Sequence, residues 1–120
     1  MERKLSTVLA LDVVGFSKLM ADDEVRTLAN LQNRRDFIDK IIGEHEGRIF
    51  NTAGDSVLAE FQSPVRALES AVQIQNKSQM VNNTAENLDK MNFRIGINIG
   101  DVMISDENVF GDAVNIAARL

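Results

Sequence analysis

The chain has 120 residues, of which 44% are apolar and 26% are charged, values that are typical of a single globular domain and exclude a disordered or low-complexity protein. The net charge of −5 argues against a general nucleic-acid partner, because nucleic-acid-binding surfaces are basic. With no cysteine and one histidine, His45, the chain lacks the residues for a thiol nucleophile, a Cys/His zinc site or a well-equipped serine–histidine triad.

The first predicted element is a strand from Leu5 to Val14, a nearly continuous apolar run rich in Val and Leu. Such a run is typical of a central strand that is covered on both faces. Asp12 interrupts the run, so the N-terminus does not resemble a signal peptide, and no apolar stretch reaches the ~18–20 residues that span a bilayer. We therefore expect no membrane insertion by this segment and, because cysteine is absent, a cytoplasmic location.

A turn over Gly15-Phe16-Ser17 separates this strand from the first predicted helix. The acidic residues Asp22, Asp23 and Glu24 open that helix, because negative side chains are favoured at the positive end of the helix dipole. Gly43 and Gly47 are expected to end it. Apolar residues at helical spacing mark its buried side: Val25, Leu28, Leu31, Ile38, Ile41 and Ile42.

A β-hairpin and a second helix follow. The two strands are predicted from Arg48 to Ala53 and from Ser56 to Phe61, with Gly54-Asp55 as the tight turn between them. Ser63-Pro64 has the residue types of a helix N-cap and first helical position. The asparagine-rich segment from Asn82 to Asn87 is predicted to be the loop after this helix.

The last predicted strand has the clearest pattern in the chain. From Phe93 to Ile99, apolar residues alternate with small or polar ones, which predicts a strand with one buried face. A turn over residues 105–108 leads toward Asp112, which is a suitable N-cap for a final helix from Ala113 to Leu120.

These elements follow the order β-α-β-β-α-β with one further helix, which predicts an α+β protein with a ferredoxin-like sheet and its helices on one face. In that topology the first strand lies antiparallel beside the third and runs in the same direction as the second. The end of the first strand, with Asp12, and the tip of the hairpin, with Asp55, should therefore lie side by side at one end of the sheet.

Asp12 and Asp55 are the first candidates for chemistry. Two carboxylates held at one sheet edge can bind a pair of divalent cations, and all-oxygen ligands favour Mg²⁺ or Mn²⁺. Such a pair suits phosphoryl or nucleotidyl transfer. The alternative is that Asp12 is an edge-exposed or capping carboxylate and Asp55 an ordinary turn residue.

Further polar groups are predicted beside this pair. The backbone N–H groups of residues 13–17 turn into a helix and offer an anion cradle, in which we expect Phe16 and Ser17 to bind substrate. Asn115 and Arg119 are four residues apart on the last helix and point the same way. Arg119 suits charge on a pentacoordinate phosphorus and Asn115 suits a sugar, although the commoner explanation for such a pair is an exposed polar helix face.

Four segments of the chain form an ordered series: residues 11–17 (LDVVGFS), 47–59 (GRIFNTAGDSVLA), 94–100 (RIGINIG) and 110–120 (FGDAVNIAARL). In this order they resemble the successive motifs of the class III nucleotidyl cyclase catalytic domain. The series extends over nearly the whole chain, so the resemblance is far more specific than any single motif.

The resemblance implies a mechanism. In the family, aspartates that match Asp12 and Asp55 hold two Mg²⁺ or Mn²⁺ ions, the ribose 3′-hydroxyl attacks the α-phosphorus, and pyrophosphate leaves to give a 3′,5′-cyclic nucleotide. The residues that match Asn115 and Arg119 act from the opposite subunit. The resemblance therefore implies a head-to-tail homodimer with two equivalent sites.

The resemblance also implies that Asn51 and Asn108 bind the purine. Adenylate cyclases usually carry a lysine at the first position and an aspartate or threonine at the second, and guanylate cyclases carry an acidic residue at the first. An amide both donates and accepts hydrogen bonds, so two asparagines suit adenine or, with their amides reversed, guanine. We expect ATP as the substrate, with GTP as the alternative.

Family domains continue for several strands after the helix that matches residues 113–120, and a lysine in that part binds the triphosphate. The resemblance therefore implies that residues 1–120 form a catalytic domain that is incomplete at its C-terminus. Two other functions stay open. One is an inactive dimerisation or nucleotide-sensing module, and the other is a polymerase-palm relative such as a diguanylate cyclase, for whose Gly-Gly-acidic hairpin Ala53-Gly54-Asp55-Ser56 is a poor substitute.

Overall fold

One antiparallel β-sheet organises the chain, of which the computed structural model describes residues 2–105 and 108–119. The strands and helices of the described residues are β1 (Glu2–Val13), α1 (Phe16–Asp22), α2 (Glu24–Glu44), β2 (Arg48–Ala53), β3 (Ser56–Phe61), α3 (Pro64–Thr84), the 3₁₀ turn η1 (Asn87–Asp89), β4 (Phe93–Ser105), β5 (Asn108–Phe110) and α4 (Asp112–Arg119). The order β-α-β-β-α-β with a final helix is confirmed, with α1, η1 and β5 as additions.

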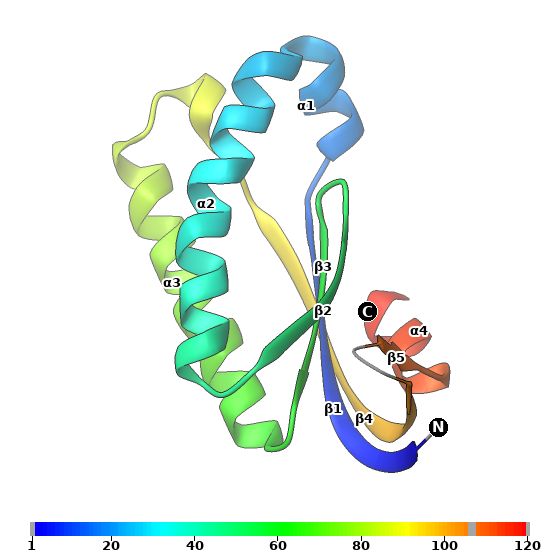
Figure 1. Cartoon of the computed structure of the whole chain (residues 1–120). Helices are drawn as coiled ribbons and strands as arrows, with labels where there is room; N and C mark the ends of the chain where they lie inside the picture. The colour runs from blue at the N-terminus through cyan, green and yellow to red at the C-terminus, as the bar shows by residue number, and fades with distance from the viewer. Residues whose placement is uncertain (1, 106–107, 120) are drawn as a thin grey trace.

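The strands lie in the order β2-β3-β1-β4-β5, and every neighbouring pair is antiparallel. The central strand β1 pairs with β4 along its whole length, from Glu2 opposite Ile104 to Val13 opposite Phe93. The long helices α2 and α3 lie side by side on one face of the sheet, and α4 lies on the other (Figure 1). The predicted ferredoxin-like sheet is confirmed, but the expectation that all helices lie on one face is wrong for α4, because alternate residues of β1 are apolar on both faces and α4 covers the second one.

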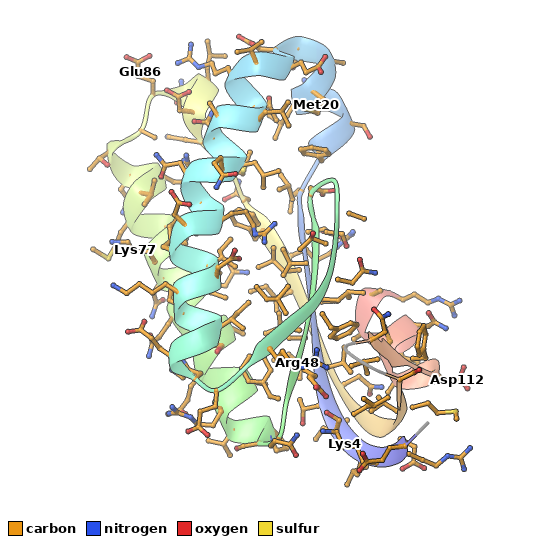
Figure 2. The ribbon with its side chains drawn as sticks, in the orientation of Figure 1. Lys4, Met20, Arg48, Lys77, Glu86 and Asp112 are labelled. Carbon is orange, nitrogen blue, oxygen red and sulfur yellow. The ribbon has the colours of Figure 1, made fainter. Side chains whose placement is uncertain are left out.

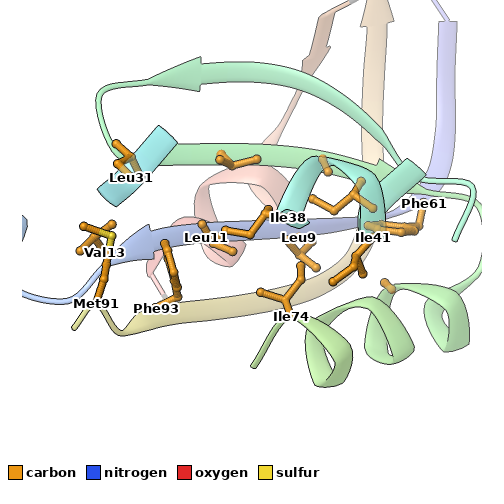
Figure 3. Close-up of a cluster of buried hydrophobic side chains, with 14 residues drawn as sticks. Leu9, Leu11, Val13, Leu31, Ile38, Ile41, Phe61, Ile74, Met91 and Phe93 are labelled. Carbon is orange, nitrogen blue, oxygen red and sulfur yellow. The ribbon is translucent and has the colours of Figure 1, made fainter. Parts of the chain in front are cut away.

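Alternate residues of β1 divide the apolar core between these two faces. Leu9, Leu11 and Val13 are buried among side chains of α2 and α3 (Figure 3), whereas Val8 and Ala10 are buried in the cluster that includes residues of α4. Burying one aliphatic side chain fully contributes roughly 1.5–3 kcal/mol. The strand is apolar at nearly every position because both of its faces are covered, as its sequence predicted.

The start of the first helical region differs from the prediction. Gly15 has a φ of 67°, a left-handed conformation that glycine adopts without strain, so the chain leaves β1 and enters α1 at Phe16. The predicted turn therefore does not extend to Ser17. The acidic segment does open the next helix, because the side chain of Asp23 caps α2 by accepting from the N–H of Arg26 at 3.1 Å. Gly43 lies inside α2 instead of ending it.

The second long helix begins as predicted and ends later. The Ser63 side chain caps it, and Pro64 occupies the first helical position. The loop predicted from Asn82 to Asn87 begins too early, because α3 continues to Thr84. The side-chain amide of Asn82 donates to the carbonyl of Met91 and accepts from its N–H, each at 3.0 Å. This amide acts like a strand partner and holds the last turn of α3 beside the start of β4.

The C-terminal part contains more strand than the alternating pattern predicted. β4 continues beyond Ile99 to Ser105, because its pairing with β1 persists although the alternation stops. Asn108, predicted to lie in a turn, begins β5, which pairs with the end of β4. Residues 106 and 107 of the predicted turn lie outside the described residues.

Candidate active site

Asp12 and Asp55 meet at one end of the sheet. The tip of the β2–β3 hairpin lies beside the end of β1 (Figure 1), and Gly54, with a φ of 59°, allows the tight turn there. The backbone N–H of Val13 donates a hydrogen bond of 2.9 Å to Oδ2 of Asp55. The structure therefore brings together the two aspartates that the topology was expected to juxtapose.

Arg94 is a third charged residue at this end of the sheet. It lies directly opposite Asp12 in the β1–β4 register, and its Nη2 donates to Oδ2 of Asp12 at 2.8 Å. The hydrogen bond to Asp12 raises the pKa of Arg94 above its ordinary value, and the negative charges of Asp12 and then Asp55 add to this. Arg94 begins the segment 94–100 that matches a family motif, but its place in the sequence predicted no role for it. Its only signal was its place in the alternating strand, since contact with Asp12 depends on the register.

The free oxygen of Asp12 fits a divalent cation. Its Oδ1 is buried and has no hydrogen-bond partner in the described part of the chain, a costly condition for a carboxylate oxygen. A hard cation such as Mg²⁺ or Mn²⁺ would satisfy it, and Asp55 offers a second carboxylate close by. Over residues 2–105 and 108–119, no cluster of three or more acidic, histidine or cysteine side chains is suited to hold a metal ion. The remaining ligands would therefore come from substrate, water or backbone.

The space beside Asp12 is small in the single chain. A cavity of about 20 Å³ lies there, lined in part by Arg94, Ser56 and Ala117 from three different elements. Small-molecule pockets usually measure ~300–1,000 Å³. The cavity beside Asp12 is therefore too small to enclose a nucleotide within the described residues of one chain.

The anion cradle predicted over residues 13–17 is shorter in the structure. The N–H of Val13 donates to the side chain of Asp55, and the N–H of Val14 donates to the carbonyl of Asn92 at 2.9 Å. The first N–H groups of a helix have no partner within the helix, so the cradle narrows to residues 15–17 at the start of α1. Phe16 is half-buried against the apolar core, and Ser17 is exposed. The expectation that Val13 and Val14 take part is wrong.

Asn115 and Arg119 are exposed on α4, whereas Ala113 and Ala117 of the same helix are buried against the sheet. Within the described residues, neither Asn115 nor Arg119 makes a hydrogen bond or ion pair with the aspartates. The fold of one chain thus presents the two polar side chains of α4 to solvent and does not join them to Asp12.

Asn51 lies on β2 and Asn108 on β5. These are the two edge strands of the sheet, yet they contact each other. Asn51 is exposed on β2, where it pairs with Leu58 of β3. Asn108 is exposed at the start of β5, where it pairs with Ser105. The sheet curls enough to bring β2 and β5 into contact. The two amides predicted to bind the purine are therefore carried by neighbouring elements.

A second charged cluster lies away from the aspartates. Glu60 of β3 is 6% exposed and accepts from Nε and Nη2 of Arg48 at 3.0 and 2.7 Å, and Lys4 lies 3.7 Å away. Lys4 and Arg48 are found toward the end of the sheet opposite the hairpin tip (Figure 2). This cluster ties β1, β2 and β3 together and is separate from the candidate site.

Comparison with known proteins identifies the class to which this fold and site belong. Residues 2–120 match the family described as the adenylate and guanylate cyclase catalytic domain. The chain therefore belongs to this family, and the resemblance inferred from its four segments is confirmed. The part of the chain that the structure describes contains no helix with the length and apolar character needed to cross a membrane.

Individual relatives agree with this assignment. Putative adenylate cyclase 3 of Rhizobium meliloti (strain 1021) is 40% identical over 119 residues, which cover 98% of this chain and 20% of that protein. The chain thus spans a fifth of the length of this curated relative.

Two solved structures share the fold. The adenylate/guanylate cyclase/hydrolase from Silicibacter pomeroyi is 40% identical with a TM-score of 0.90, over 98% of this chain and 69% of that chain. The guanylate cyclase domain of RhGC from Catenaria anguillulae, solved in complex with GTP, is 25% identical with a TM-score of 0.78, over 99% of this chain and 73% of that chain.

Proposed function

We propose that this chain is the catalytic domain of a nucleotidyl cyclase that converts ATP, with GTP as the alternative substrate, to the 3′,5′-cyclic nucleotide and pyrophosphate. The observation that carries the proposal is the apposition of Asp12 and Asp55, held by the hydrogen bond from the N–H of Val13, in a chain that belongs to the cyclase family. Two carboxylates at one sheet edge match the requirement of two-metal nucleotidyl transfer.

In this reaction the ribose O3′ forms a bond to the α-phosphorus, and the bond between the α-phosphorus and the oxygen that bridges to the β-phosphate breaks. The hydroxyl proton passes to solvent, and pyrophosphate leaves. Asp12 and Asp55 would hold two ions, Mg²⁺ or Mn²⁺, whose charge activates the 3′-hydroxyl and neutralises the leaving group. The N–H groups of residues 15–17 suit the phosphate oxygens.

The other half of the site is proposed to come from a second copy of the chain. Asn115 and Arg119 are exposed on α4 and the cavity beside Asp12 is about 20 Å³, which supports a site shared between two subunits. In a head-to-tail homodimer, Arg119 of one copy stabilises charge on the phosphorus held by the other, and Asn115 orients the ribose.

Substrate choice is assigned to Asn51 and Asn108. Because each amide both donates and accepts, one can donate to adenine N1 and the other can accept from the adenine amino group. Both nucleotides are abundant in the cytoplasm, and a chain without cysteine suits that compartment, so we place the reaction there.

A turnover assay tests the proposal. Wild-type chain is incubated with ATP or GTP and with Mg²⁺ or Mn²⁺, and cyclic nucleotide is measured beside Asp55→Asn and the control Asp39→Asn. Asp39 pairs with Arg35 on the exposed side of α2, away from the site. Asp55→Asn should lower turnover by roughly 100-fold or more, and Asp39→Asn should leave it unchanged. Absence of product from wild type, or equal rates in all three proteins, would refute the proposal.

A second candidate function is nucleotide sensing without catalysis. It draws on the ion pair between Arg94 and Asp12, which neutralises one of the two carboxylates. Titration calorimetry with Mg²⁺ and a nucleoside triphosphate separates the two functions. Tight binding without product supports a sensor, and product formation excludes it.

A further inference from the structure

An apolar cluster on the α4 side of the sheet includes side chains of β2, β5 and α4, the elements that carry Asn51, Asn108 and the pair Asn115 and Arg119. We call it the α4-side cluster. Its buried members are Val8, Ala10, Val102, Val109, Ala113 and Ala117, and Phe50, Leu58, Ile104 and Val114 pack against it. Val109 is the neighbour of Asn108 along β5, and Phe50 is the neighbour of Asn51 along β2. The two amides are thus each adjacent in sequence to a side chain of one cluster.

A β-bulge gives Phe50 its place in this cluster. Ile49 pairs with Ala59 and Asn51 with Leu58, so Phe50 is the extra residue on β2. Ile49 packs against the cluster on the α2–α3 side, and Phe50 against the α4-side cluster. A bulge redirects the side chains that follow it, because two residues then stand opposite one.

The bulge has a consequence for Asn51. Directly paired residues of an antiparallel ladder have side chains on the same face of the sheet. Leu58 packs against the α4-side cluster, so its partner Asn51 lies on that face too. Strict alternation from Ile49 would have placed Asn51 on the face of α2 and α3. The bulge at Phe50 therefore moves Asn51 from the α2–α3 face to the α4 face of the sheet, and Phe50 itself packs on that α4 face.

We infer that Phe50 is a positioning residue for nucleotide selectivity, because its ring joins the bulge that carries Asn51 to the cluster that holds β5 and Asn108. This inference rests on the proposed function for the roles of the two amides. Phe50 touches no substrate in this scheme. It sets the relative position of the amide-bearing strands β2 and β5, which contact each other.

Ile49 provides a matched control. It is half-buried like Phe50, adjacent to it on β2, and packs on the opposite face. Ile49→Ala and Phe50→Ala therefore both truncate an apolar side chain of the same strand, but only Phe50→Ala removes contact with the α4-side cluster. Phe50→Leu keeps an apolar contact and serves as the conservative variant if Phe50→Ala fails to fold.

The first measurement is amide hydrogen exchange of the whole chain, which needs no activity. Phe50→Ala should accelerate exchange over residues 108–110 by about tenfold relative to wild type, because local opening of β5 becomes easier. Ile49→Ala should not accelerate it, and Phe50→Leu should lie between. Equal exchange of residues 108–110 in the Ile49 and Phe50 variants would overturn the inference.

The second measurement is the ratio of kcat/KM for ATP to that for GTP. Phe50→Ala should change this ratio by about tenfold, mainly through KM, and Phe50→Leu should restore part of it, with Ile49→Ala close to wild type. If wild type forms cyclic nucleotide and the ratio is the same in all variants, the inference fails while the proposed function stands. If wild type forms none, the proposed function fails, and hydrogen exchange alone decides whether Phe50 couples the strands.

Discussion

Arg94 and Asp12 form an ion pair across directly opposed positions of β4 and β1, with 2.8 Å between Nη2 and Oδ2. The pair lies beside Asp55, whose charge also acts on Arg94. The Arg94 guanidinium is bonded to Asp12 and only feels the charge of Asp55, so two carboxylates near one guanidinium leave a net negative charge for a cation to balance. The Oδ1 atom of Asp12, buried and without a hydrogen-bond partner in the described residues, is the atom that such a cation would meet.

Removal of this guanidinium should strengthen cation binding. In Arg94→Gln the two carboxylates lose their neutralising partner, so the nucleotide-free chain should bind Mn²⁺ about three- to tenfold more tightly, an attraction reduced by solvent at this partly exposed site. Electron paramagnetic resonance of free Mn²⁺ measures the affinity. Arg35→Gln, which removes an exposed pair with Asp39 on α2, should change nothing. Weaker or equal Mn²⁺ binding in Arg94→Gln would contradict the assignment of Asp12 as a ligand.

Asp55→Asn, which we expect to lower turnover, should leave the stability of the fold nearly unchanged. In Asp55→Asn the side-chain carbonyl still accepts from the N–H of Val13, and the lost charge removes both the repulsion of Asp12 and the attraction for Arg94, so the folded state should be about as stable as wild type. Asp55→Ala leaves that N–H without its acceptor and should be less stable than Asp55→Asn by about 1 kcal/mol. Urea unfolding measures both. Equal stability of the two variants would show that the hydrogen bond contributes nothing.

The strands and helices could be predicted where the residues of one element carry the signal themselves, either as an apolar pattern that matches the burial of the element or as a capping residue. β1 was recognised because both of its faces are apolar, and α3 because Ser63 caps it at the position that its side-chain type suggests. The proximity of Asp12 and Asp55 followed from topology alone. These features depend on short-range chemistry and on the small number of ways in which such elements connect.

The features that escaped prediction depend on register. The contact of Arg94 with Asp12 requires the pairing of two strands that are distant in sequence, and the bulge at Phe50 has no local signal in the residues of β2. The loss of the Val14 N–H from the anion cradle arises from its bond to Asn92, a residue beyond α3. No residue pattern within one element specifies these long-range pairings.

The buried cluster around Glu60 should carry more stability than an exposed ion pair. Glu60→Ala removes the acceptor of the two hydrogen bonds that Nε and Nη2 of Arg48 donate to Glu60, and we expect a loss of about 1–3 kcal/mol. Glu69→Ala removes the exposed i,i+3 partner of Arg66 and should cost less than about 0.5 kcal/mol. Chemical denaturation of both variants compares them. Similar losses would refute the importance of burial here.

Asp89 should make the stability of the folded state depend on pH. Hydrogen bonds from Arg26, at 2.8 Å from Nη2, and from Asn30, at 3.1 Å, lower the pKa of Asp89 from 3.8 to about 2. Because the folded-state pKa lies below the unfolded value, the ionised carboxylate stabilises the fold above about pH 4, and this stabilisation disappears as the pH falls toward 2.

Asp89→Asn isolates this dependence. The Tm of wild type should exceed that of Asp89→Asn at pH 6, and the difference should shrink between pH 4 and pH 2, as followed by circular dichroism. The matched control is Asp36→Asn, whose exposed carboxylate accepts from Gln32 of the same helix. A Tm difference that stays constant down to pH 2 would contradict the role of Asp89.

Substitution by alanine should have opposite effects on stability at two glycines near the end of α2, Gly43 and Gly47. A Cβ at Gly47 would lie 2.5 Å from ring carbons of Phe61 and 2.7 Å from Cγ2 of Ile42, and both side chains are buried and almost inaccessible. Gly47→Ala must therefore displace core residues and should cost about 1–3 kcal/mol. At Gly43, inside α2, an added Cβ meets no atom within 4 Å.

Gly43→Ala should therefore stabilise the protein by about 0.5–1 kcal/mol, because alanine loses less backbone entropy in a helix than glycine. Thermal unfolding of the two variants gives the signs directly, since Tm should rise for Gly43→Ala and fall for Gly47→Ala. A neutral Gly47→Ala would mean that the chain between α2 and β2 relaxes away from the Phe61 ring at no cost, and that this contact does not determine how the helix leads into the hairpin.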